Sequence, residues 1–214
     1  MEPVLVLAID TSTATVVSGV VADGRTIGET ILPDCRDHNE QLVVATQRAL
    51  EQAGKTFQDV DAVVVGAGPG PFTGLRVGMA TGAAFADALG IPVYGVCSLD
   101  AIAAQIPGTA LVTSDARRRE VYWATYQDGV RTSEPEVNAY ADVNTEGFDA
   151  VNVPQNLQDK IAGTHDLYPT PAALVSLVDF AVEPTKLTPL YLRRPDAKEP
   201  AARPKSPAIP DVAL

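Results

Sequence analysis

The chain has 214 residues, of which 46% are hydrophobic, so it can bury a core in one large domain or two small lobes. Its 16 basic and 27 acidic residues give a net charge of −11, which argues against direct binding of RNA or DNA, because nucleic-acid affinity draws on Lys and Arg. Cys35 and Cys97 form no CxxC motif, which argues against a disulfide framework and fits a cytoplasmic location. We expect no signal peptide, and no membrane span because charges and prolines interrupt the apolar region from Val77 to Ser114.

The chain begins with three predicted strands. Val4–Ile9 is continuously apolar and indicates a buried strand, which the polar turn Asp10–Thr13 ends. Ala14–Val21 is rich in Val and Thr, and Asp23-Gly24 marks a hairpin turn before a third strand at Thr26–Leu32. This order predicts an antiparallel meander.

A helix should follow the meander. Asp37 can cap it, with Glu40 three residues later to complete a capping box, and Gly54 is placed to end it. A strand at 62–65, a helix at 74–89 and a strand at 91–96 then complete a predicted βββαβαβ lobe of the α/β class.

The second half of the chain carries weaker patterns. Short strands are predicted at Leu111–Thr113, Val121–Tyr126 and Ala150–Val153. A helix is predicted at Thr170–Val182, with Pro171 in its first turn. Residues 195–214 contain five prolines and few groups that could pack, which predicts a flexible tail.

The stretch VVVGAGPGPFTGLRVG, Val63 to Gly78, has the form of a strand, a glycine-rich loop and a helix start. A P-loop needs a lysine after its last glycine, and none lies between Lys55 and Lys160. A dinucleotide-binding fingerprint needs a third glycine where Pro71 stands. The third interpretation is a tight turn with Thr73 as helix cap, and the loop alone leaves the choice between a nucleotide site and this turn open.

Small residues recur every four positions along the second predicted helix. Such glycines cost roughly 1 kcal/mol each relative to alanine and let another backbone approach closely. The stripe either packs on the chain's own sheet or contacts another subunit, and the sequence leaves both open. Its residues are Gly74, Gly78, Gly82 and Ala86, and a companion stripe on the first helix comprises Leu42, Thr46, Ala49 and Ala53.

Five segments occur in order along the chain: LAIDTST, HNEQLVVATQRAL, GPGPFTGLRVG, DARRREVYWA and PLYLRRPDA. Together they resemble the TsaB family, also called YeaZ, of the bacterial tRNA threonylcarbamoyladenosine machinery, over about residues 4–197. Pro71 departs from the serine that is more usual there. The resemblance implies an actin-, Hsp70- and sugar-kinase-like (ASKHA) fold with lobes at 1–98 and 99–194, the second truncated.

In working members of that fold, the first turn and a glycine-rich loop face nucleotide phosphates. The resemblance therefore implies vestigial nucleotide-facing loops here, with no cofactor or only weak binding of ATP or ADP. Their residues are Asp10, Thr11, Ser12, Gly68, Gly70 and Thr73.

The resemblance also implies a non-catalytic subunit. TsaD would be its partner and would transfer the threonylcarbamoyl group to adenosine of ANN-decoding tRNAs, TsaE would join a larger complex, and the chain alone would form a homodimer. TsaD carries a metal-binding HxxxH pair, and Ser98 and Ile102 stand at those positions here, so no metal is expected. We expect the helices at 39–53 and 74–89, through their small-residue stripes, to form one side of a four-helix subunit contact.

Two enzyme classes remain as alternatives. One is a metallopeptidase, which the older family label glycoprotease suggests, although His38 and His165 are the chain's only histidines. The other is a small-molecule ATPase or kinase that uses Asp10 and the loop at Thr73.

Other polar groups are expected to be structural. Ser114, Asp115 and Glu120 have no nearby histidine to complete a triad. Asp115 and Arg117 are expected in a turn or in a salt bridge between lobes or subunits. Cys97 ends an apolar strand and is expected to be inert packing.

Overall fold

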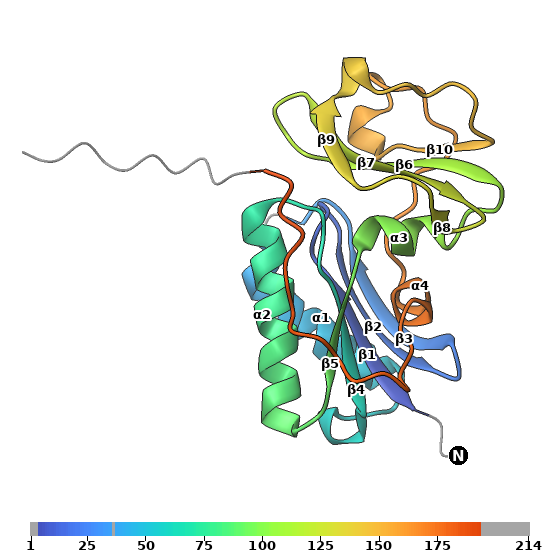
Figure 1. Ribbon diagram of the computed structural model, residues 1–214. Coiled ribbons are helices and arrows are strands. Elements are labelled where there is room, and N and C mark those ends of the chain that lie inside the picture. The colour runs from blue at the N-terminus through green and yellow to red at the C-terminus, as the bar shows by residue number, and fades with distance from the viewer. Residues whose placement is uncertain (1–3, 36, 194–214) are drawn as a thin grey trace, which may run out of the picture.

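Two lobes, each built on a five-stranded sheet, make up the computed structural model, which describes residues 4–35 and 37–193. The first lobe lies below the second in Figure 1, and α3 (Ser98–Ala103) lies between them. The predicted tail at 195–214 falls outside the described residues. No helix among the described residues has the length and apolar character that crossing a membrane requires.

The first sheet confirms the predicted meander. Its strands are β1 (Leu5–Asp10), β2 (Val16–Ala22), β3 (Arg25–Leu32), β4 (Ala62–Gly66) and β5 (Val93–Val96), in the order β3-β2-β1-β4-β5. β2 pairs antiparallel with both β1 and β3, whereas β1, β4 and β5 run parallel. The carboxyl ends of β1 and β4 therefore meet at one edge, where the polar turn and the glycine-rich loop begin.

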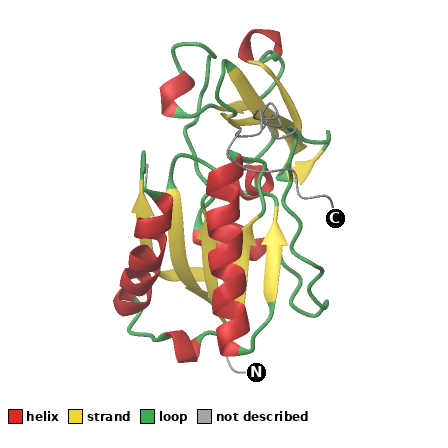
Figure 2. Cartoon of the chain, turned by 90° about the vertical axis from the view of Figure 1, so that its left-hand side faces the viewer, coloured by secondary structure: helices red, strands yellow, loops and turns green. Residues whose placement is uncertain are grey.

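Helices cover both faces of this sheet. α1 (His38–Gln52) and α2 (Phe72–Leu89) pack on one face, and α4 (Pro171–Ser176) packs on the other. Figure 2 shows α1 and α2 in front of the sheet. Side chains alternate between the faces, so Leu7 and Val65 join the α1–α2 core while Ala8 joins the α4 core.

The helix starts differ from the predicted caps. Asp37 occupies the N-cap of α1 but makes no side-chain capping bond, so the predicted capping box is wrong. Thr73 does not cap α2 either, because the helix already begins at Phe72 and the carbonyl of Pro71 accepts from Leu75 N at 3.0 Å. Gly54 follows α1 with a φ of +64°, which confirms it as the terminating glycine.

The second sheet has the order β10-β6-β7-β8, with β9 also paired to β7. Its strands are β6 (Thr109–Asp115), β7 (Glu120–Gln127), β8 (Val130–Arg131), β9 (Glu136–Ala139) and β10 (Ala150–Asn152). Short 3-10 turns occur at Phe57–Asp59, Tyr140–Asp142 and Gln155–Leu157. β8, β9 and α3 were not predicted, because two to six residues show little periodicity.

α4 is much shorter than the helix predicted at 170–182. Thr170 caps it by accepting from Ala173 N, and Pro171 takes the first turn as expected. The helix stops at Ser176, and two residues beyond its C-cap the Asp179 carboxylate accepts from Ala181 N at 3.0 Å. This local turn competes with a continued helix.

Residues 183–193, here called the C-terminal strap, run along the first lobe and up to the second, beside β5 and α2 (Figure 1). Leu187 packs on the α1–α2 core, and Leu190 N donates to the carbonyl of Ala67 at 2.8 Å. Arg193 forms an ion pair with Glu120 and donates to the carbonyl of Ala116 at 2.7 Å. The strap therefore ties the two lobes together.

Candidate functional site

The turn after β1 is held by a closed network of hydrogen bonds. Asp10 is fully buried, and its Oδ1 accepts from the backbone N–H and the hydroxyl of Ser12, each at 2.8 Å. Its Oδ2 accepts from the Ser98 hydroxyl at 2.5 Å. Burial raises the pKa of Asp10, and the hydrogen bonds from Ser98 and Ser12 together with the nearby charge of His38 oppose that rise.

The glycine-rich loop packs directly on this turn. A Cβ at Gly66 would overlap Asp10 Oδ2, and one at Gly70 would overlap the carbonyl of Ser12. Gly68 has a φ of +98°, a conformation that favours glycine. The glycines are therefore needed to bring the loop against the chain's own polar turn, whether or not any ligand binds there.

The structure brings most of the predicted nucleotide-facing residues together. Asp10, Ser12, Gly68 and Gly70 lie buried around the turn, and the Thr11 hydroxyl donates to the carbonyl of Gly74 at 2.7 Å. Thr73 lies apart from them, because it is exposed at the start of α2. The Ser98–Asp10 bond joins residues 88 positions apart and was not predicted.

The structure corrects the placement of the glycine stripe. A Cβ at Gly78 would overlap Thr11 Oγ1, and one at Gly82 would overlap Val65 Cγ1, so α2 presents this stripe to its own sheet. The companion stripe on α1 is placed likewise, since a Cβ at Gly28 of β3 would overlap the carbonyl of Ala49. Seven of the eight stripe residues are buried within this chain and Ala53 is partly buried: Leu42, Thr46, Ala49, Ala53, Gly74, Gly78, Gly82 and Ala86.

The opposite side of the helix pair carries exposed apolar groups, here called the outer helix surface. Phe72 is 48% exposed, Arg76 lies over its ring at 5.1 Å, and Tyr191 of the strap stacks on it at 5.3 Å. On α1, Val43 and Val44 are 41% and 39% exposed. Large apolar side chains exposed together are a common property of protein-binding surfaces.

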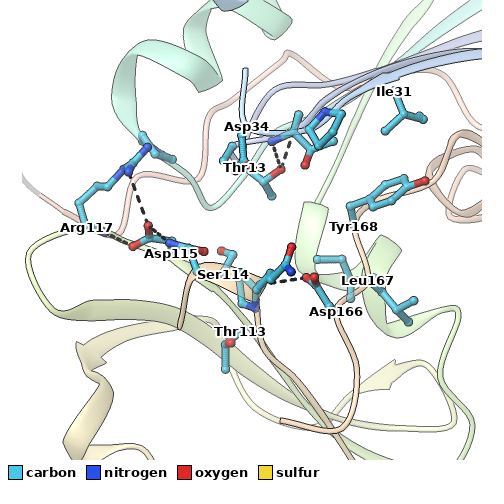
Figure 3. A pocket seen from close by; sticks show the side chains of 18 residues that line it. Thr13, Ile31, Asp34, Thr113, Ser114, Asp115, Arg117, Asp166, Leu167 and Tyr168 are labelled. Atoms are coloured by element: carbon cyan, nitrogen blue, oxygen red, sulfur yellow. Dashed lines mark hydrogen bonds and ion pairs between the residues drawn. The ribbon is translucent and has the colours of Figure 1, made fainter. Parts of the chain in front are cut away.

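A cavity of about 380 Å³ lies between the two lobes (Figure 3). Thr13, Ile31 and Asp34 line it from the first lobe, and Ser114 and Asp166 are among the residues that line it from the second. Its volume is in the range of small-molecule sites.

The turn after β6 contributes Asp115 and Arg117 to the lining of this cavity. Asp115 accepts from Arg117 N at 2.7 Å and from Asn156 Nδ2 at 2.9 Å, and the Arg117 guanidinium lies 3.7 Å from the same carboxylate. The turn predicted for Asp115 and Arg117 is confirmed, and the ion pair stays within the second lobe. Arg117, Arg118 and Arg119 all have positive φ, between 56° and 63°.

The chain's two histidines lie apart from each other and from Ser98 and Ile102, the residues at the positions of the TsaD HxxxH pair. His38 Nε2 is buried at the start of α1 and has no hydrogen-bond partner among the described residues, whereas His165 Nδ1 lies 2.8 Å from the Thr164 hydroxyl beside β10. Ser98 holds Asp10, and Ile102 is buried in the second-lobe core. Among residues 4–35 and 37–193, no three His, Cys, Asp or Glu side chains gather as a metal site would need.

A second polar cluster joins α3 to the second sheet and was also missed. Asp100 accepts from the Tyr126 hydroxyl at 2.8 Å and from Arg131 Nε at 3.0 Å. Burial, followed by the charge of Asp100, raises the pKa of the neighbouring Cys97 thiol to about 12. Cys97 is therefore a neutral thiol near pH 7, which is consistent with inert packing.

The first sheet, its flanking helices and the second lobe define an ASKHA-like fold. A family model described as "TsaD: tRNA N6-adenosine threonylcarbamoyltransferase" matches residues 15–193. YeaZ from Pseudomonas aeruginosa, a solved structure, is similar with a TM-score of 0.72 and 27% identity, over 88% of this chain and 100% of that one. This chain belongs to the family that the model describes, as a TsaB/YeaZ-type member.

Relatives in sequence agree with that assignment. An uncharacterized protein of Mycobacterium tuberculosis is 54% identical over 197 residues, covering 90% of this chain and 93% of its own. The tRNA threonylcarbamoyladenosine biosynthesis protein TsaB of Bacillus subtilis is 34% identical over 125 residues, 57% of this chain and 55% of its own. The family takes part in tRNA threonylcarbamoyladenosine biosynthesis.

Proposed function

We propose that this chain is a non-catalytic subunit that pairs with a TsaD transferase and supports threonylcarbamoyl transfer to adenosine of ANN-decoding tRNAs. The observation that carries the proposal is the closed network at Asp10. Both carboxylate oxygens accept hydrogen bonds from the chain's own Ser12 and Ser98. The position that faces a phosphate in ATP-using members of the fold is thus occupied by a structural network.

The outer helix surface is the proposed contact with TsaD. It combines an exposed aromatic ring at Phe72 with a guanidinium at Arg76, and aromatic residues and Arg are enriched among the residues that dominate binding energy. TsaD would share this fold, so in its absence a second copy would take its place about a two-fold axis. TsaE would join the larger assembly in the cytoplasm.

TsaD is also the proposed source of the tRNA contacts. The net charge of −11 on this chain repels the phosphate backbone, so the isolated chain is expected to bind tRNA weakly or not at all. The proposed role needs no bound cofactor, and weak binding of ATP or ADP would be incidental to it.

Association with the organism's own TsaD tests the contact. Phe72→Ala and Arg76→Glu should each weaken the heterodimer roughly tenfold or more in calorimetric titrations, because they remove central contacts. Val130→Ala is the control, since Val130 is 69% exposed on the second lobe, away from these helices. Unchanged association of both helix variants, with their folding verified by circular dichroism, would place the contact elsewhere.

The isolated chain tests the two enzyme alternatives. Protein prepared without chelators should carry no stoichiometric metal, cleave no peptide and turn over no ATP. One tightly held zinc or iron per chain, or ATP turnover that Asp10→Asn abolishes, would overturn the non-catalytic assignment. Nucleoside analysis of tRNA treated with TsaD, with and without this chain, then measures whether it activates the transferase.

A further inference from the structure

We propose that the cavity between the lobes binds a small organic cation, with an ammonium or guanidinium group on a short hydrocarbon body. Ser114 provides the first observation. It is 2% exposed and lines the cavity, yet its hydroxyl has no hydrogen-bond partner among the described residues. A buried hydroxyl without a partner destabilises the fold, so a ligand that places a polar group beside Ser114 would remove this unfavourable contribution.

The position of Ser114 on its strand turns it toward the cavity. Alternate residues of β6 share a face, so Ser114 lies on the same side as Ala110 and Val112. That side packs against α3, whose Ile102 also lines the cavity. Figure 3 shows Ser114 on the lower wall, between Asp115 and Asp166.

The charged side chains around the cavity favour a positively charged ligand. Three carboxylates line it, from Asp34, Asp115 and Asp166, against one guanidinium, from Arg117. Arg117 is already paired with Asp115. Asp34 and Asp166 lie on opposite walls (Figure 3), and neither forms an ion pair within the described part of the chain, although Asp166 Oδ1 accepts from Gln155 N at 3.2 Å. A cation placed between these walls would be attracted by both, and a phosphate would be repelled.

Apolar groups complete the lining and define the rest of the ligand. Ile31 approaches from the first lobe, and Leu167 and the ring of Tyr168 approach from the second. These surfaces suit a short hydrocarbon chain that separates a charged head from a second polar end. The cavity of about 380 Å³ accommodates a molecule of that size.

Agmatine, which joins a guanidinium and an ammonium by four methylenes, is a suitable probe for the full-length chain. Calorimetric titration at low salt should show saturable binding of agmatine, and inorganic phosphate should show none. In amide NMR spectra, agmatine should shift Thr15, Ser114 and Leu167, which line the cavity from both lobes. Absence of saturable agmatine binding, or equal binding of phosphate, would overturn the proposal.

Matched variants test the two walls. Asp34→Asn and Asp166→Asn should each weaken agmatine binding at least threefold, and Ser114→Ala should weaken it without reducing thermal stability. Asp87→Asn, an exposed change on α2 that removes the same charge, should leave the affinity unchanged. If Asp87→Asn weakens binding as much as the cavity variants, the effect is long-range attraction and the site is refuted.

A second probe distinguishes the source of the cation. N-acetyl-arginine amide carries the guanidinium of a protein side chain but lacks the free amine of agmatine. Tighter binding of agmatine than of this probe supports a free small amine as the ligand. Tighter binding of the arginine probe would overturn the proposed small-molecule ligand and favour an arginine side chain of a protein partner. Failure of both probes refutes the shared chemistry, and neither result depends on TsaD binding at the outer helix surface.

Discussion

Ser98 supplies one of the hydrogen bonds on which the buried Asp10 depends. Ser98→Ala leaves Asp10 Oδ2 without its donor, so the variant should lose about 1.5–3 kcal/mol of unfolding free energy. Urea denaturation measures the loss. Ser176→Ala is the control, because that hydroxyl donates to the carbonyl of Ala173 at the end of α4 and its removal leaves no buried charge. Equal, small losses in both variants would show that the Asp10 network contributes little.

The raised pKa of Asp10 predicts a specific pH dependence of stability. The folded chain holds the Asp10 proton more tightly than the unfolded chain, whose pKa is near 3.8. The resulting stabilisation is fully present below that value and is lost as pH rises through the raised folded-state pKa.

Asp10→Asn isolates this contribution, because the other carboxylates titrate in both proteins. The stability of the wild type minus that of Asp10→Asn should fall as pH increases above about 4 and then level off. Urea unfolding at a series of pH values from 4 to 8 measures the difference. A difference that instead grows with pH would mean that the hydrogen bonds outweigh burial at Asp10.

For individual residues, the sequence indicated which ones lie close together but not which hydrogen bonds hold them there. The motif LAIDTST identifies Asp10 and Ser12, and the glycines of the loop are expected beside them. Ser98 was noted only as a replaced metal ligand, because a bond across 88 positions leaves no local pattern. Ser114 was considered only as a member of a triad, and its lack of a partner is visible only in the folded chain.

At the scale of elements, the glycine stripe of α2 determines how closely the helix approaches its sheet. Gly82→Leu would drive a side chain into Val65, so the variant should lose about 1–3 kcal/mol or more. Ala84→Leu is the matched control on the exposed side of α2 and should change stability by less than about 0.5 kcal/mol. Thermal and urea unfolding of both variants give the comparison. A fully stable Gly82→Leu protein that no longer associates with its partner subunit would show that the stripe forms a subunit contact after all.

Elements were predicted well where their patterns were long. Three strands with β-branched runs and a helix with an apolar stripe could be placed to within a few residues. The orientation of the α2 stripe could not be predicted, because small residues permit close approach by any backbone. Only the contact of Gly82 with Val65 in the folded chain shows that the stripe faces the sheet. The predicted length of α4 was wrong because the chain forms the turn at Asp179 within residues 177–182, the six residues of the predicted helix that lie beyond Ser176.

At the scale of the molecule, the C-terminal strap should stabilise the arrangement of the two lobes. Deleting residues 184–214 removes Leu187, the bond from Leu190 to Ala67 and the contacts of Arg193, and should cost on the order of 3 kcal/mol. Deleting 194–214 alone retains those contacts and serves as the control. Urea unfolding and small-angle scattering measure stability and lobe separation, and identical behaviour of the two truncations would contradict the role of the strap.

The two-lobed architecture was predicted through resemblance, whereas the path of the chain between the lobes was not. Residues 99–194 were assigned to the second lobe, yet α4 and the strap pack on the first lobe. The second sheet itself lies within the predicted range. No periodic pattern marks the strap, because its contacts are made by single residues several positions apart.

The return of the chain to its first lobe has a consequence for synthesis on the ribosome. The first sheet is complete at Val96, but α4, which covers its second face, begins only at Pro171. Ribosomes add about 5–20 residues per second, so synthesis of the roughly 75 intervening residues takes several seconds. During this time the apolar side chains of that face, such as Val6, Ala8 and Val64, stay uncovered. A nascent chain paused in the second lobe would therefore expose a bare sheet face that chaperones recognise.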